Sequence, residues 1–206
     1  MQLSPLTRFF WRVVIWLPIC FAIWYYMAGV IALPVNLLTD WVMSGLFPDL
    51  IREISPNRHL LDIVCAFTPP AQPGLVVPEG QVAELVFSIN SLIYGYSIPL
   101  YSALILASPG EEKQKWFRWI IGFVVLSLVQ VWGISFDILK SLLFDLGREV
   151  NQLLNFSQVQ KEGIVLGYQL GYLVLPAVTP LILWIGFHRD FLQELIQKTD
   201  AQHPGT

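Results

Sequence analysis

Residues 164–187, IVLGYQLGYLVLPAVTPLILWIGF, contain no charged side chain and decide the fold class. An α-helix needs about 20 apolar residues to cross the hydrocarbon core of a bilayer, and this stretch is longer than that. Three further apolar stretches cover residues 13–33, 91–107 and 117–136. The sequence therefore predicts an all-α polytopic membrane protein with four transmembrane helices.

The composition supports this prediction and excludes two classes of protein. Of the 206 residues, 55% are hydrophobic and 13% are charged, whereas a soluble domain carries about 25% charged residues. A water-soluble globule is therefore excluded. Lys and Arg number 12 against 15 Asp and Glu, and no basic stripe is present that would neutralise phosphates, so nucleic-acid binding is excluded as well. We expect a single membrane domain with a modest portion outside the bilayer.

The distribution of Lys and Arg predicts the orientation. The side of the membrane with the higher density of these residues is cytoplasmic. Both termini are then cytoplasmic, and the loops of residues 34–90 and 137–163 are extracytoplasmic. The cations assigned to the cytoplasmic side are Arg8, Arg12, Lys113, Lys115, Arg118, Arg189 and Lys198, and those assigned to the outer side are Arg52, Arg58, Lys140, Arg148 and Lys161.

The two outer loops carry structure of their own. The first begins with a helical pattern over residues 34–54, which continues the first helix past a kink at Pro34. Five prolines between residues 55 and 90 exclude a long helix there, and the alternating segments 61–67 and 82–89 predict a β-hairpin. The second loop predicts an amphipathic helix from about residue 137 to 155 that covers the hairpin.

Three glycines in the fourth span mark a helix contact surface. Gly163, Gly167 and Gly171 repeat every four residues, so they share one helix face and allow another backbone to approach closely. Tyr168 and Tyr172 flank this face. The sequence favours a contact within the chain and leaves a contact with another protein open.

Polar side chains in or beside the apolar stretches are further candidates, because each needs a partner in hydrocarbon. The second span is rich in them and should therefore face protein. Asp137 stands three residues before Lys140, so a local ion pair is the simplest explanation for it. The candidates for helix packing or partner binding in this group are Asn90, Tyr94, Tyr96, Gln130 and Asp137.

Candidates for chemistry are few. Cys65 in the predicted hairpin is a thiol nucleophile only if His59 and Arg58 activate it, and an ordinary buried thiol is the preferred interpretation. Cys20 lies deep in the first helix, too far from Cys65 for a disulfide. No histidine shares a helix face with another His or with a Cys, so we expect no metal and no cofactor.

Three motifs together resemble a known family. They are FFWRV at 9–13 followed by WLP at 16–18 and WYY at 24–26, NSLIYGYSIPL at 90–100, and QVWGISFDILK at 130–140. With these motifs the chain resembles the exosortase-H-associated membrane proteins, from about residue 5 to 195.

The resemblance implies an accessory protein of the bacterial inner membrane that serves a protein-sorting system of the envelope. An exosortase is a multispanning transpeptidase with a Cys, Arg and His set, and its substrates carry a C-terminal sorting signal. The resemblance implies that the accessory is not that enzyme, and it transfers no catalytic residue. The implied partners are an exosortase or its sorting-signal substrate, together with the lipid bilayer. Two alternatives stay open, a structural subunit of a respiratory or photosynthetic complex and a thiol-dependent enzyme using Cys65. A transporter is the weakest option.

Overall fold

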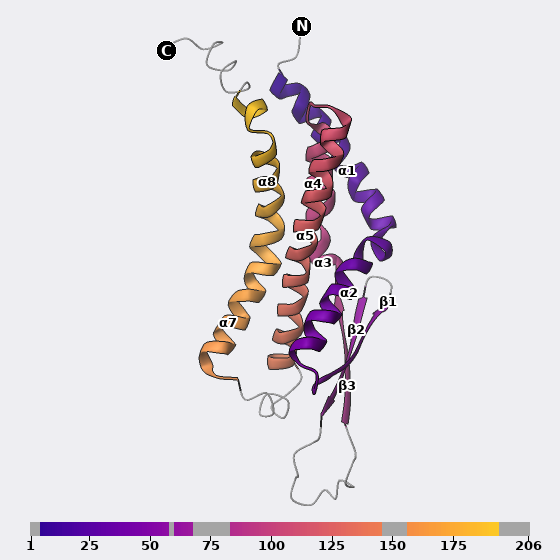
Figure 1. Ribbon diagram of the computed structural model, residues 1–206, viewed down its shortest axis with the longest axis vertical. Helices are drawn as coiled ribbons and strands as arrows, with labels where there is room; N and C mark the ends of the chain where they lie inside the picture. Colours follow the sequence, from indigo (N-terminus) through magenta and orange to yellow (C-terminus); the bar gives the residue numbers. More distant parts are fainter. Residues whose placement is uncertain (1–4, 58–59, 68–82, 146–155, 194–206) are drawn as a thin grey trace, which may run out of the picture. The chain divides into compact units, whose positions relative to one another are not determined.

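The computed structural model describes residues 5–57, 60–67, 83–145 and 156–193. These residues are mostly helical and include one three-stranded antiparallel sheet (Figure 1). The chain forms two compact units. Unit 1 comprises residues 1–27, 96–126 and 176–206, and unit 2 comprises residues 28–95 and 127–175. The long helix α5, Glu112–Lys140, contributes its first half to unit 1 and its second half to unit 2.

Unit 1 is built from helices. α1 packs against α4, and the Tyr101 hydroxyl of α4 donates to the Arg118 carbonyl of α5 over 2.8 Å. Phe9 stacks on Trp184 with ring centroids 5.2 Å apart, which joins α1 to α8. The elements of this unit, besides the first half of α5, are α1 (Pro5–Tyr26), α4 (Ser97–Ala107) and nearly all of α8 (Leu175–Phe187).

Unit 2 combines the sheet with helices. Apolar residues of α2, of all three strands and of the second half of α5 form one buried core, which includes Met43, Ile63 and Ile134. The elements of this unit, besides that half of α5, are α2 (Ala28–Leu46), β1 (Ile51–Asn57), β2 (Leu60–Phe67), β3 (Ala83–Asn90), α3 (Leu92–Gly95), the π-helical segment η1 (Ser141–Asp145), α7 (Gln158–Gln169) and the π-helical segment η2 (Leu170–Val174).

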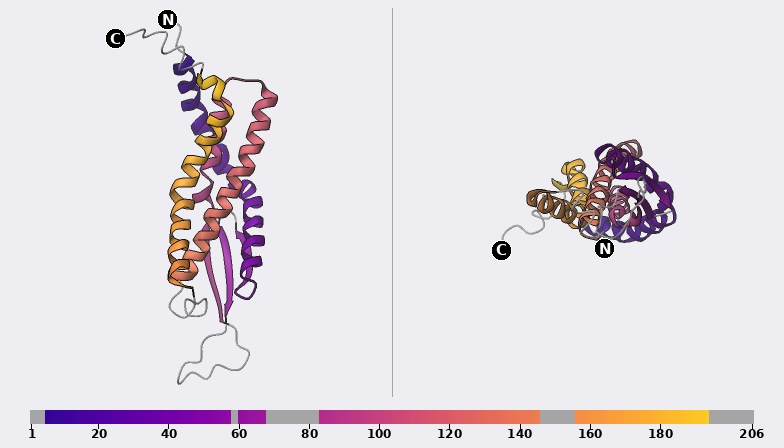
Figure 2. Two further views of the ribbon diagram at one scale, coloured as in Figure 1. Left: turned by 60° about the vertical axis from the view of Figure 1, so that its left-hand side comes forward. Right: turned by 90° about the horizontal axis from the view of Figure 1, so that it is seen from below.

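The sheet has the order β1-β2-β3, and its strands lie side by side in Figure 2. Ile63 of β2 pairs with Ile54 on one side and with Phe87 on the other. Since side chains alternate between the two faces of a strand, these residues enter the core and their neighbours point outward. On the outward face Asp62 accepts hydrogen bonds from Ser88 and Asn57.

Four helical stretches of the described chain are long and apolar enough to cross a membrane: Leu6–Tyr26, Ala28–Leu46, Glu112–Asp145 and Gln158–Phe187. Their number agrees with the prediction, but the set differs. The predicted span 91–107 is divided into the short helices α3 and α4, and α2 stands in its place among the four.

The bounds of the other spans also differ from the predicted ones. The predicted first span, 13–33, crosses the break between α1 and α2 at Met27, while Pro34 lies inside α2. Membrane helices tolerate a proline where neighbouring helices, polar side chains or a local change of helix geometry satisfy the backbone groups that it leaves free. The fourth span starts at residue 158, earlier than predicted, because Ser157 and Gln160 form a reciprocal capping box there.

Two predictions for the outer loops need correction or lie outside the described chain. Residues 51–57 form β1 and not the end of a helix, so the predicted hairpin gains a third strand. β1 pairs antiparallel with β2, the strand that follows it, from Asn57 with Leu60 to Ile51 with Cys65. The apolar spacing of residues 34–54 matches a helix and does not report this pairing. Of the predicted helix 137–155, the part up to Asp145 continues α5 through η1, and the remainder lies outside the described residues.

Candidate functional site

The glycine face of the fourth span contacts α5 within unit 2. A Cβ atom placed on Gly171 would lie 2.7 Å from the Cα atom of Gly133, so the two backbones touch. One turn earlier, Gly167 packs against the ring of Phe136. The indole Nε1 of Trp132 donates to the Gly167 carbonyl over 3.1 Å. These three α5 residues were missed by sequence reasoning, although a glycine between bulky neighbours in QVWGISFD was the available signal.

Gly163 differs from the other two glycines of this face. A Cβ atom placed on it would meet nothing within 4 Å. The predicted face is thus divided between two packed glycines and one with open space. A partner contact through this face stays a prediction, and Gly163 is the position with room for it.

Tyr94 fills the space above Gly133 and is 1% exposed. Its hydroxyl forms a side-chain hydrogen bond with the Asp137 carboxylate. Its ring meets Tyr172 edge to face, with the centroids 6.1 Å apart. The sequence expectation of an ion pair between Asp137 and Lys140 is therefore corrected, because Asp137 is directed to a tyrosine hydroxyl.

The other polar candidates have separate positions. The side-chain Oδ1 of Asn90 accepts from the Leu92 backbone N–H over 3.1 Å, so this side chain forms a local turn just before α3. Gln130 is 3% exposed, and its Nε2 has no hydrogen-bond partner among the described residues. Tyr96 stands just before α4, half-buried, and belongs to unit 1.

Four residues form the accessible part of the site, which we call the tyrosine-lysine patch: Lys140, Asp145, Tyr168 and Tyr172. The two tyrosine rings stack with centroids 5.7 Å apart, and the Lys140 ammonium lies 5.5 Å from the centre of the Tyr168 ring. Lys140 also pairs with Asp145 over 2.9 Å. Tyr172 is 38% exposed and the Lys140 side chain 31%. The patch therefore offers hydroxyl and ammonium donors beside an apolar helix.

Comparison with known proteins places this arrangement in a family. The chain matches the family model of the exosortase H-associated membrane proteins over residues 3–191. It belongs to this family. Comparison with curated proteins and with solved structures found no match. The match covers all of unit 2, most of unit 1 and the whole tyrosine-lysine patch.

Cys65 of this exosortase H-associated protein is a core residue. It is 1% exposed in β2 and pairs in register with Ile51 and Leu85. Burial raises the pKa of its thiol to about 11, so the nucleophilic thiolate is scarce at neutral pH. Arg58 and His59, its proposed activators, lie outside the described residues. The described chain also contains no cluster of three or more His, Cys, Asp or Glu side chains suited to a metal ion.

Proposed function

We propose that this protein is a non-catalytic accessory subunit that binds and positions partners of an exosortase-type protein-sorting system in the bacterial envelope. The observation that carries the proposal is the family match over residues 3–191, because the family is described as exosortase H-associated membrane proteins. We further propose that both termini lie in the cytoplasm of an inner-membrane protein and that the sheet lies outside it.

The surface that we assign to a partner is the tyrosine-lysine patch together with the outer face of α7 and η2. Leu166 and Leu173 are 58% and 60% exposed, and Gln169 is exposed between them, so this face carries two apolar side chains and one amide. A transmembrane helix of a partner would pack on the leucines and receive hydrogen bonds from the patch. Such bonds contribute about 0.6 to 2 kcal/mol each in a membrane.

Site-specific photocrosslinking in native membranes tests this function. A photoreactive residue at Tyr172 should crosslink to an exosortase or to a protein that carries its sorting signal. The matched control is Ile164, which lies on α7 but is 6% exposed and should yield no adduct with another protein. If adducts at Tyr172 contain only lipid or this chain itself, the assigned surface is wrong.

The two alternatives have direct tests. Cys65→Ala should leave sorting intact, because a buried thiol with a raised pKa supplies no thiolate. Loss of sorting by a variant that still folds would support the thiol enzyme. Haem or pigment absorption in a complex purified with this chain would instead support a respiratory or photosynthetic subunit.

A further inference from the structure

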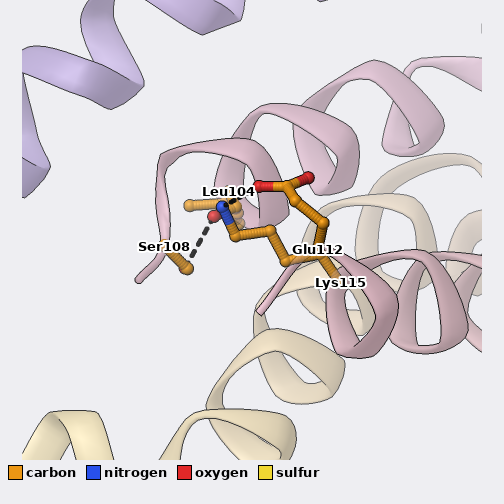
Figure 3. Close-up of polar contacts among 4 residues, drawn as sticks. All are labelled: Leu104, Ser108, Glu112 and Lys115. Carbon is orange, nitrogen blue, oxygen red and sulfur yellow. Dashed lines mark hydrogen bonds and ion pairs between the residues drawn. The ribbon is translucent and has the colours of Figure 1, made fainter. Parts of the chain in front are cut away.

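A set of buried polar groups lies in unit 1 where α4 ends and α5 begins. The Ser108 hydroxyl donates to the Leu104 carbonyl over 2.7 Å and accepts from the Trp184 indole Nε1 over 2.7 Å. Figure 3 shows the first of these bonds, with Lys115 directed towards the same turn and paired with Glu112 over 3.2 Å. Residues of α4, α5 and α8 therefore converge at this turn.

His188 adds an unused hydrogen-bond acceptor to this set. Its ring stacks on Trp184, and its Nδ1 lies 3.0 Å from the Trp184 carbonyl oxygen. A carbonyl only accepts, so Nδ1 carries the hydrogen and the neutral ring leaves Nε2 as a bare acceptor. Nε2 is buried and has no partner within the part of the chain that the structure describes, and the residue is 4% exposed.

The charges of two cations act on the His188 ring. Burial lowers the pKa of His188, and the charges of Arg118 and Lys115 lower it further, while the hydrogen bond to Trp184 opposes them. The Lys115 side chain is only 17% exposed, and its partner Glu112 is 77% exposed. Among the described residues Arg118 has no ion-pair partner. The site therefore combines two positive charges, only one of them paired with an acid, with a neutral acceptor whose ring stacks on Trp184 at the Ser108 turn.

These groups lie at the ends of two apolar helices, where the headgroups of a bilayer would lie. The apolar stretch that begins with α5 starts at Glu112, and His188 directly follows the one that ends at Phe187. Trp116 and Phe117 are 62% and 66% exposed on the same turns of α5. Exposed aromatic rings beside cations at the end of an apolar helix are typical of the membrane-water interface.

We propose that Lys115, Arg118 and His188 bind the headgroup of an anionic phospholipid that carries a free hydroxyl. The phosphate takes the two cations, and the headgroup hydroxyl donates to Nε2 of His188. This chemistry fits phosphatidylglycerol. Phosphatidylcholine does not fit, because it has neither a net negative charge nor a hydrogen-bond donor in its headgroup. Phosphatidic acid has the negative charge but no headgroup hydroxyl beyond the phosphate.

The test measures lipid bound to the purified full-length chain by native mass spectrometry after exchange with each of these three lipids. The wild type should retain phosphatidylglycerol in preference to phosphatidylcholine. The double variant Lys115→Gln/Arg118→Gln should lose affinity for both anionic lipids, by about fivefold for each cation. His188→Phe keeps the stacking on Trp184 and should weaken phosphatidylglycerol while leaving phosphatidic acid unchanged.

Lys113→Gln is the matched control, because Lys113 is an exposed cation on the same turns of α5 and is not among the charges that act on His188. It should change lipid binding little. A second measurement needs no variant. In the ¹⁵N spectrum of the labelled wild type, addition of phosphatidylglycerol should shift the Nε2 resonance of His188, assigned by its absence in His188→Phe.

Three outcomes would overturn the proposal. One is equal retention of phosphatidylglycerol and phosphatidylcholine by the wild type. Another is an equal loss in Lys113→Gln and in the double variant, which would show only a diffuse charge effect. The third is displacement of the lipid by an equal concentration of soluble glycerol phosphate, which would mean that the site takes a free phosphate ester and not a lipid.

Discussion

Gly133 and Gly171 meet backbone to backbone, since a Cβ atom on Gly171 would lie 2.7 Å from the Cα atom of Gly133. This contact holds the second half of α5 against η2. Tyr172 directly follows one glycine, and Lys140 stands two turns after the other. The closest approach of the two helices therefore also sets the positions of residues in the tyrosine-lysine patch.

Gly171→Ala should destabilise the protein, because the added methyl group has no space and the backbones must separate. Overpacking of this kind costs about 1 to 3 kcal/mol. Gly163→Ala is the matched control, since its Cβ atom would meet nothing within 4 Å, and it should stabilise the helix by about 0.5 to 1 kcal/mol. Unfolding in detergent followed by circular dichroism measures both, and equal stability of the two variants would contradict the packing.

Trp132→Phe should remove the hydrogen bond from the indole to the Gly167 carbonyl while keeping an aromatic ring in place. The expected loss of unfolding free energy is about 0.6 to 2 kcal/mol. Trp116→Phe serves as control, because Trp116 is 62% exposed. The same unfolding measurement applies, and a Trp132→Phe variant as stable as the control would mean that this bond contributes nothing.

Asp62 predicts a pH dependence for the outward face of the sheet. Hydrogen bonds from Ser88 and Asn57 lower the pKa of its carboxyl group. A lowered native pKa stabilises the fold above the unfolded pKa of about 4, and this contribution is lost as the pH falls through the native value. Ser88→Ala should raise the pKa of Asp62 in an NMR titration. Ser55→Ala, a serine paired in register with Asp62 on β1, should leave it unchanged.

Cys65 should react slowly with maleimide at pH 7.5 in a Cys20→Ala background and faster after denaturation. Because burial raises the pKa of its thiol to about 11, the native protein holds this proton more tightly than the unfolded chain. The associated stabilisation is complete below the unfolded pKa of about 9 and is lost as the pH rises towards 11. Rapid labelling of the folded protein at pH 7.5 would contradict both the burial and the raised pKa.

The orientation proposed from Lys and Arg counts is tested by fused reporters. Alkaline phosphatase inserted near Pro73 should be active, because it folds outside the cytoplasm, and a fluorescent protein at the C-terminus should fluoresce inside. As a control the two reporters are exchanged. Alkaline phosphatase at the C-terminus should then be inactive, and the fluorescent protein near Pro73 should not fluoresce. Active phosphatase at the C-terminus would reverse the orientation.

Local features of the sequence predicted much of the fold. The uncharged run 164–187 predicted the last apolar helix, and the alternation over residues 61–67 predicted β2. Both are properties of neighbouring residues, which a single sequence reports directly. Local features predicted helix ends and side-chain partners less well. The first helix was expected to run unbroken as far as Pro34, whereas it ends at Tyr26 and α2 begins at Ala28, and Asp137 was paired with the nearest lysine.

The sequence by itself determined that this chain is an apolar helical protein of the exosortase H-associated family, because composition, periodicity and motifs are properties of residues that are close in sequence. Only the tertiary structure decided what each candidate residue contacts. The backbone of Gly171 contacts Gly133, and the Tyr94 hydroxyl is hydrogen-bonded to Asp137. The strand β1 is defined by its pairing with β2. The two glycines, and likewise Tyr94 and Asp137, stand far apart in the sequence, so their contacts depend on distances in space that no local pattern encodes. β1 and β2 are neighbours in the sequence, but the helical spacing of residues 34–54 did not report their pairing.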